Sequence, residues 1–116
     1  MSRAVRERQG RAAEGWAALY LRLTGWRILA RRVKTPRGEI DLIARRGGTL
    51  AFIEVKWRSS AELLDQAIDA HRLRRVAAAA QAVMTDYMHG AQRVRIDVLL
   101  LAPWRFPRHI ANAWQP

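Results

Sequence analysis

Three apolar segments suited to β-strands follow one another in the first half of the chain, and only short turns separate them. They cover residues 26–33, 39–44 and 50–58, with turns at 34–38 and 45–49 that contain Gly or Pro. If the second and third strands form a hairpin about the paired glycines of the 45–49 turn, each residue of one strand acquires a defined partner in the other. This hairpin constrains the fold more than any other feature.

Two helical segments flank these strands. Apolar residues at helical spacing predict a first helix over residues 3–24 and a second that is clearest over 66–88. Ser59 with Glu62 forms a possible capping box, so the second helix could begin near residue 60. The apolar stripe expected to face the core in the first helix consists of Ala12, Trp16, Leu19, Tyr20 and Leu23.

Further strands at 94–102 and 109–114 complete the order α-β-β-β-α-β-β. Such an order predicts an α/β fold in which a mixed sheet is flanked by helices. The length of 116 residues, half of them hydrophobic, fits a single domain over residues 1–116. The absence of cysteine excludes disulfides, thiolate metal sites and cysteine nucleophiles.

The chain is strongly basic, with a net charge of +11 and a pI near 11.7. A polyanionic partner is expected, and nucleic acid is the commonest one, with membrane surfaces and acidic proteins as alternatives. The longest apolar stretch is interrupted by Arg22 and Arg27, and the N-terminus lacks a signal-peptide pattern. We therefore expect a cytoplasmic protein without a membrane span.

The predicted hairpin gathers acidic side chains. Opposed positions sum to 95, which places Asp41 opposite Glu54 and Glu39 opposite Lys56. Because side chains alternate along a strand, these four share one face of the sheet. Between residues 15 and 60 there are ten basic residues and only three acids, and all three acids fall on this face.

Two opposed carboxylates need a compensating charge. At a β-carbon separation of about 5 Å, Asp41 and Glu54 would repel by roughly 3 kcal/mol at an effective dielectric near 20. A divalent cation bound between them would turn this penalty into a binding site, and oxygen ligands suit Mg²⁺ or Mn²⁺. The alternative is a solvated strand face with ordinary ion pairs, namely Glu39–Lys56 and Asp41 with Arg58 or Arg45.

A metal site beside a lysine in a basic domain suits phosphodiester hydrolysis. A divalent cation polarises a phosphoryl oxygen and lowers the pKa of a bound water. Lys56 could orient that water or stabilise the charge that develops on phosphorus, because its ammonium is a compact charge.

The stretch from Asp41 to Glu54-Val55-Lys56 resembles the signature of the PD-(D/E)xK nuclease superfamily, which has a restriction-endonuclease-like α-β-β-β-α-β core. The segments QGRAAEGWAALYL, GEIDLIA, LAFIEVKWR and VRIDVL more closely resemble the YraN family. These small bacterial proteins are similar to archaeal Holliday-junction resolvases. The resemblance covers about residues 9–114, and it departs from the superfamily pattern at Ile40, where a proline is usual.

The resemblance implies a set of site residues. Asp41 and Glu54 would bind the metal together with the main-chain carbonyl of Val55, and Lys56 would be the catalytic lysine. Glu14 matches a first-helix glutamate that points toward the metal in resolvases, although an Arg11–Glu14 surface pair is the alternative. Glu39 is expected as a neighbour of the site or as the partner of Lys56.

Basic residues near the predicted site are candidates for phosphate contacts. Resemblance and charge suggest Arg72, Arg74 and Arg75 at the start of the second helix, and Arg58 at the end of the third strand. A solvated helix edge is the alternative for the three helical arginines. We expect a structural role for Asp97, paired with Arg93 or Arg95, and core positions for Trp16, Trp26 and Trp57.

The leading functional hypothesis is a Mg²⁺- or Mn²⁺-dependent endonuclease that hydrolyses phosphodiester bonds in DNA, with branched or damaged DNA as candidate substrates. A non-catalytic nucleic-acid-binding module on a nuclease-like fold is one alternative, and an RNA-directed nuclease is another. By analogy with resolvases, a homodimer is expected.

Overall fold

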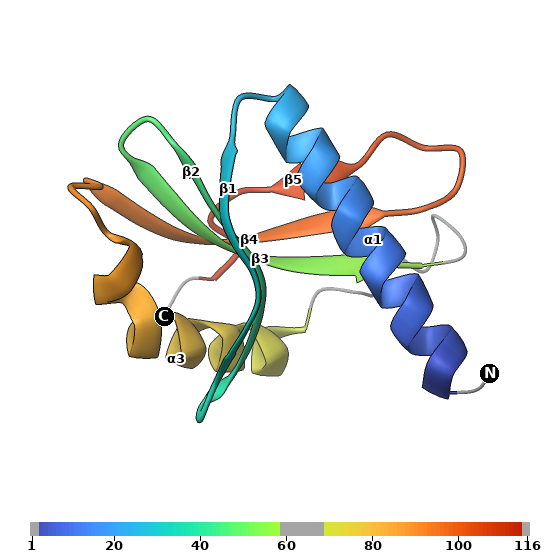
Figure 1. Ribbon diagram of the computed structural model, residues 1–116, viewed down its shortest axis with the longest axis horizontal. Coiled ribbons are helices and arrows are strands. Elements are labelled where there is room, and N and C mark those ends of the chain that lie inside the picture. Colours follow the sequence, from blue (N-terminus) through green and yellow to red (C-terminus); the bar gives the residue numbers. More distant parts are fainter. Residues whose placement is uncertain (1–2, 59–68, 115–116) are drawn as a thin grey trace.

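The computed structural model describes residues 3–58 and 69–114 and contains the predicted order of helices and strands (Figure 1). This order confirms the α/β class expected from the sequence. The elements are α1 (Arg3–Leu23), β1 (Arg27–Thr35), β2 (Gly38–Arg46), β3 (Thr49–Trp57), α3 (Ala70–Tyr87), β4 (Arg93–Leu101) and β5 (Arg108–Ile110).

The helix boundaries follow from local capping. At the end of α1, Gly25 has a φ of 96°, and the Trp26 N–H donates back to the Leu21 carbonyl at 2.9 Å, which closes the last turn. At the start of α3, the Asp69 carboxylate accepts a hydrogen bond from the His71 N–H at 2.9 Å. The helix start near residue 60 and the Ser59–Glu62 capping box lie outside the described residues.

The five strands form one mixed sheet in the order β1-β2-β3-β4-β5. The pairs β1–β2, β2–β3 and β4–β5 are antiparallel, whereas β3 and β4 are parallel. The parallel pair needs a crossover, and α3 lies in that connection. The C-terminal ends of β3 and β4 therefore lie side by side (Figure 1).

The predicted hairpin register is confirmed over its first half. Partners run from Arg46 with Thr49 to Leu42 with Ile53, and each pair sums to 95 as expected. Beyond Leu42 and Ile53 the ladder ends, although both strands continue. The far part of β2 remains paired with β1, so these two strands diverge together from β3 (Figure 1).

The helices cover opposite faces of the sheet. On one face α3 contributes the predicted stripe, with Leu73 and Val76 buried against Ile43, Phe52 and their neighbours. On the other face α1 packs against a second cluster that includes Leu42, Ala51 and Ile53. The diverging end of β2 packs on α3: a β-carbon added at Gly38 would lie 3.3 Å from the Arg75 carbonyl oxygen.

The predicted core face of α1 is wrong except at Tyr20, which packs against the core. Trp16 and Leu23 expose 68% and 77% of their surface, and the buried side chains are instead Ala13, Ala17, Ala18 and Leu21. Small side chains allow the helix to approach the sheet closely at Ala44 and Ala51, which lie in the same cluster. The core position predicted for Trp26 is confirmed, and Trp57 is partly buried in this cluster, on the sheet face opposite Glu54.

Candidate active site

Glu54 is a buried carboxylate held between two cations. Its side chain is only 3% exposed, and its Oε1 accepts a hydrogen bond from Arg72 Nε and lies 3.2 Å from Lys56 Nζ. Lys56 reaches it from the same face of β3, whereas Arg72 reaches it from the first turn of α3. A buried carboxylate is costly without such partners.

Asp41 lies where β2 leaves β3. The backbone pairing of β2 with β3 ends at its neighbour Leu42. At Asp41 a side-chain contact takes over, because Oδ2 accepts a hydrogen bond from the Val55 N–H at 2.8 Å. Burial and the negative charge of Glu54 raise the pKa of Asp41 to about 7, although the Val55 N–H opposes the shift. The structure thus places Asp41 beside Val55 and close enough to Glu54 for their charges to repel; the register predicts the closeness to Glu54, and the family resemblance implies a role for Val55.

The main-chain carbonyl of Val55 faces the same neighbour as its N–H. In a strand, the N–H and C=O of one residue point to the same side, and successive residues alternate sides; the N–H of Arg58, three residues on, donates to the Leu101 carbonyl of β4. Since Asp41 receives the Val55 N–H, the Val55 carbonyl also faces β2, beyond the last paired position. The Asp41 carboxylate and the Val55 carbonyl oxygen therefore both lie at the gap between the strands, and Glu54 is the residue before Val55.

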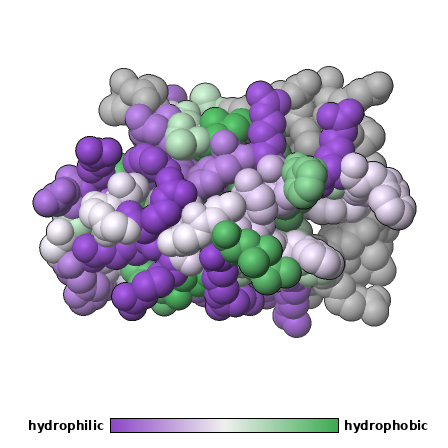
Figure 2. Space-filling model, turned by 90° about the horizontal axis from the view of Figure 1, so that it is seen from above, coloured by the Kyte–Doolittle hydropathy of each residue, from purple (hydrophilic) through white to green (hydrophobic). Residues whose placement is uncertain are grey.

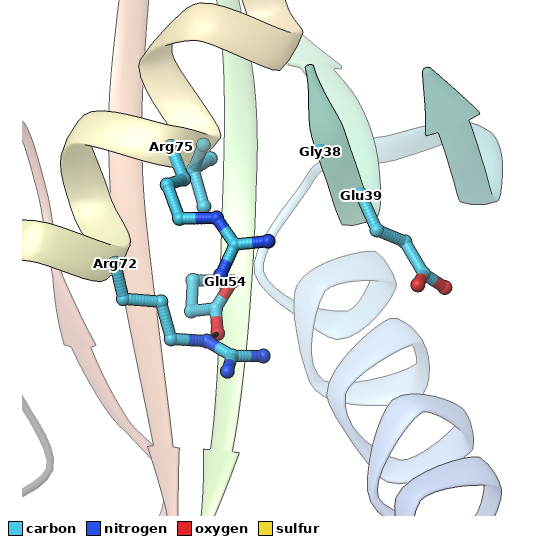
Figure 3. Close-up of a pocket in the computed structure, with 6 residues that line it drawn as sticks. Gly38, Glu39, Glu54, Arg72 and Arg75 are labelled. Carbon is cyan, nitrogen blue, oxygen red and sulfur yellow. Dashed lines mark hydrogen bonds and ion pairs between the residues drawn. The ribbon is translucent and has the colours of Figure 1, made fainter. Parts of the chain in front are cut away.

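Glu39 is a neighbour of the site but not the partner of Lys56. Together with Glu54, Arg72 and Arg75 it lines a cavity of about 130 Å³. Figure 3 shows the Glu39 carboxylate directed away from Glu54 and the two arginines. The predicted Glu39–Lys56 pairing fails because the ladder ends before these positions and Lys56 contacts Glu54 instead.

Glu14 joins the site through a residue that the sequence did not identify. Glu14 Oε2 accepts a hydrogen bond of 2.5 Å from Arg32 Nε, which replaces the alternative Arg11–Glu14 surface pair. The charge of Glu14 also contributes to the raised pKa of Asp41, because the two carboxylates are close enough to repel.

Arg32 lies opposite Asp41 across the β1–β2 ladder. The flanking partners are Arg31 with Leu42 and Val33 with Ile40, so the register places Arg32 at the Asp41 position. Its φ of 51° is unusual for a residue other than glycine. The pKa of Arg32 is raised by the hydrogen bond to Glu14 and by the nearby carboxylates. The observed turn between the paired residues Thr35 and Gly38 sets this register, whereas a symmetric closure of the expected 34–38 turn would place Arg31 opposite Asp41.

Of the four arginines predicted to contact nucleic acid, two lie beside Glu54 and two do not line its cavity. Arg72 and Arg75 extend from α3 into the cavity beside Glu54 (Figure 3). Arg74 is exposed and does not line this cavity, because it lies on the opposite side of the helix from the apolar stripe. Arg58 Nη1 donates to the Trp57 carbonyl at 2.9 Å.

The alternative ion pair between Asp41 and Arg45 is also not formed. Arg45 Nη1 donates to the carbonyls of Met88 and His89, at 3.2 and 2.7 Å, at the opposite end of β2. Its side chain fixes the end of α3 to the β2–β3 turn, which is a structural role.

Asp97 has the predicted structural role. It is fully buried and accepts hydrogen bonds from Arg95 Nη2 at 2.9 Å and from the Asn112 N–H at 2.8 Å, and it lies 2.7 Å from His109 Nε2. Burial raises the pKa of Asp97, but these hydrogen bonds outweigh it and lower the pKa overall. The expected partner Arg95 is confirmed, and the cluster anchors the segment after β4.

Among the described side chains, those of residues 11–58 and 69–114, no three of His, Cys, Asp or Glu are grouped closely enough to bind a metal ion. Within residues 3–58 and 69–114, no helix is long and apolar enough to cross a membrane. Any metal at Asp41 and Glu54 would therefore be held by two carboxylates and a carbonyl oxygen, with water or a phosphate completing its coordination.

Comparison with known proteins places these residues in a family. A model described as "Uncharacterised protein family UPF0102" matches residues 13–101, which include Glu14, Asp41, Glu54 and Lys56. The chain belongs to the UPF0102 family. This finding agrees with the resemblance to YraN proteins.

Relatives in this family match along the whole chain. A UPF0102 protein of Erythrobacter litoralis is 63% identical over 116 residues and covers 100% of both chains. Another from Rhizorhabdus wittichii is 62% identical over 112 residues, covering 97% of this chain and 95% of its own. A third from Sphingopyxis alaskensis is 57% identical over 116 residues, again with 100% coverage of both chains.

Proposed function

We propose that this UPF0102 protein is a metal-dependent endonuclease that hydrolyses phosphodiester bonds in nucleic acid, with DNA preferred over RNA. The observation that carries the proposal is the convergence of Asp41, Glu54 and Val55 at the point where β2 leaves β3, with Lys56 directly beside them. The resemblance to PD-(D/E)xK nucleases and the net charge of +11 support the same assignment.

The donor atoms suit Mg²⁺ or Mn²⁺. These ions are commonly bound by one or two carboxylates while water and substrate phosphates fill the other positions. The raised pKa of Asp41 supports a cation site, because burial and then the charge of Glu54 disfavour the Asp41 carboxylate, and a bound cation would offset both effects. When bound, the metal would supply Lewis-acid activation of a phosphoryl oxygen and of a water molecule.

The surrounding side chains would then have distinct tasks. Lys56 could hold the attacking water or stabilise the charge on phosphorus, and its present contact with Glu54 Oε1 keeps it at the carboxylate. Arg72 and Arg75 would bind phosphate oxygens at the cavity mouth. Glu14 would position Arg32 beside Asp41, rather than bind the metal directly.

The charge distribution suits a backbone-binding protein. On the face shown in Figure 2, hydrophilic residues predominate and the hydrophobic ones are scattered between them. A basic, mostly polar surface favours sequence-independent contacts with phosphates, which would make binding salt-dependent. Branched or damaged DNA remains the candidate substrate on the basis of the resolvase resemblance alone.

A cleavage assay tests this proposal. Duplex, single-stranded and four-way-junction DNA, with RNA of the same sequences, would be incubated with the protein and Mn²⁺ and compared with Asp41→Asn. We expect cleavage of at least one DNA substrate by the wild type and none by the variant. Cleavage that persists in Asp41→Asn would show that the activity comes from elsewhere.

The alternative is a binding module without catalysis, and the same variant separates the two. Asp41→Asn removes a negative charge near the expected phosphate, so affinity for DNA without metal should be unchanged or higher. Cleavage should be lost because an amide is a poor ligand for a hard cation. If a folded Asp41→Asn lost binding and cleavage together, Asp41 would be a recognition residue and the nuclease assignment would be wrong.

A further inference from the structure

The segment between β4 and β5 carries two aromatic side chains that the described part of the chain leaves exposed. Trp104 and Phe106 expose 102% and 93% of their surface, which makes them the most exposed large hydrophobic residues among those whose side chains are described. Arg105 lies between them, and the three residues line a shallow open cavity of about 300 Å³. Large aromatics on a surface usually mark a binding site.

The backbone holds this segment in a defined shape. Pro103 and Pro107 border the aromatic pair and restrict the chain on both sides. Trp104 has a φ of 61°, which is a strained value for a bulky residue and one that functional segments often contain. The preceding β4 is anchored through Asp97, and the following residues His109 and Asn112 contact the same carboxylate.

The segment follows the C-terminal end of β4, which lies beside the C-terminal end of β3 and Lys56. Lys56 pairs with Leu100 in the parallel ladder, and the Arg58 N–H donates to the Leu101 carbonyl at 3.0 Å. The chain then leaves β4 beside the end of β3 (Figure 1). Leu100 lies one strand spacing from Lys56, and four further residues lead to Trp104. The Cα atom of Trp104 is therefore within about 19 Å of that of Lys56, which is the length of roughly five or six stacked nucleotides.

We infer that Trp104, Arg105 and Phe106 form a base-stacking site for unpaired nucleotides next to the candidate active site. Aromatic faces bind any base by stacking, and an arginine between them can contact the phosphate or stack on the base. The net charge of +11 favours a nucleic acid over a protein as the occupant. This inference rests on the proposed function and specifies its substrate, which must present unstacked bases.

Binding measurements without metal test the inference independently of cleavage. A fluorescein-labelled twelve-nucleotide oligo-dT and a labelled abasic strand of the same length would each be titrated with the protein in buffer that contains EDTA. The fluorescence anisotropy of the label would report binding. Both strands carry the same phosphates, so any difference in affinity reports the bases. We expect the wild type to prefer the base-bearing strand, and Trp104→Ala to weaken its binding by about 5- to 150-fold.

Controls make the result specific. The abasic strand should bind Trp104→Ala as it binds the wild type, and Trp104→Phe should retain most of the preference because it keeps an aromatic ring. Trp16→Ala removes another exposed tryptophan, 68% exposed on α1, and should change nothing. Arg105→Met should weaken the binding of both strands and reduce the salt dependence of that binding.

Other outcomes would overturn the inference. Equal affinity of the wild type for both strands would exclude base stacking while leaving the nuclease proposal intact, since cleavage is assayed separately. No binding of either strand would overturn this inference and count against nucleic acid as the substrate. A wild-type dimer that dissociates in Trp104→Ala would show that a second copy covers the aromatic pair.

Discussion

Asp41→Asn should stabilise the metal-free protein, and the gain should depend on pH. Burial and the charge of Glu54 raise the pKa of Asp41 from 3.8 to about 7. Between these values the folded protein keeps a proton that the unfolded chain has lost. The free energy of unfolding therefore falls as the pH rises from about 4 to about 7. At 1.36 kcal/mol per pH unit, the loss above pH 7 amounts to at most about 4 kcal/mol.

The asparagine variant avoids this loss because its side chain is neutral at every pH and still offers an oxygen to the Val55 N–H. Urea unfolding in EDTA at pH 4 and pH 8 would measure the difference. We expect nearly equal stability at pH 4. At pH 8 the variant's midpoint should be higher by up to roughly 2 M, for an m-value of about 2 kcal/mol/M.

Two comparisons make the measurement decisive. Glu39→Gln removes a carboxylate that is exposed, and it should show no comparable pH-dependent gain. Mn²⁺ at pH 8 should raise the midpoint of the wild type, because the cation compensates the charge at Asp41 and Glu54, but not that of Asp41→Asn. A stability difference that is the same at pH 4 and pH 8 would refute the electrostatic reasoning.

Three further predictions address catalysis, binding and structure. Lys56→Met should abolish cleavage and weaken DNA binding while Mn²⁺ affinity by calorimetry is largely kept; full activity would remove Lys56 from the mechanism. In filter-binding assays, the logarithm of the DNA association constant should fall steeply with the logarithm of the salt concentration, and a flat dependence would contradict phosphate contacts. Asp97→Ala should lower the free energy of unfolding by about 3–5 kcal/mol, because Arg95 and His109 lose a buried partner. An unchanged urea midpoint would contradict the anchoring role of Asp97.

The hairpin is predictable because its information is local. Two glycines with alternating apolar strands on either side define one register, and the observed pairs from Arg46–Thr49 to Leu42–Ile53 follow it. Residue spacing about the turn is enough to place Asp41 next to Glu54 and Val55. The second helix is equally clear, because its stripe of Leu73 and Val76 repeats at helical spacing and faces one side of the sheet.

The prediction for α1 failed because hydrophobicity alone does not indicate which face fits. Trp16 and Leu19 carry more apolar surface than the alanines beside them, so the pattern favoured the wrong side. Close packing against Ala44 and Ala51 requires small residues, and this requirement appears only when helix and sheet meet. The corrected face also explains why Glu14, in line with Ala18 and Leu21, borders the site.

The amino-acid order alone predicts the α/β class from the succession of its helices and strands, and it predicts the hairpin register and the placement of Asp41 and Lys56 beside Glu54 from spacing within two neighbouring strands. Only the tertiary structure assigns Arg72 to Glu54 and Arg32 to Glu14, and only it shows that Trp104 and Phe106 are exposed. Those two ion pairs join elements distant in sequence. They depend on where β2 diverges from β3 and on how α3 packs against the sheet, which no local pattern encodes.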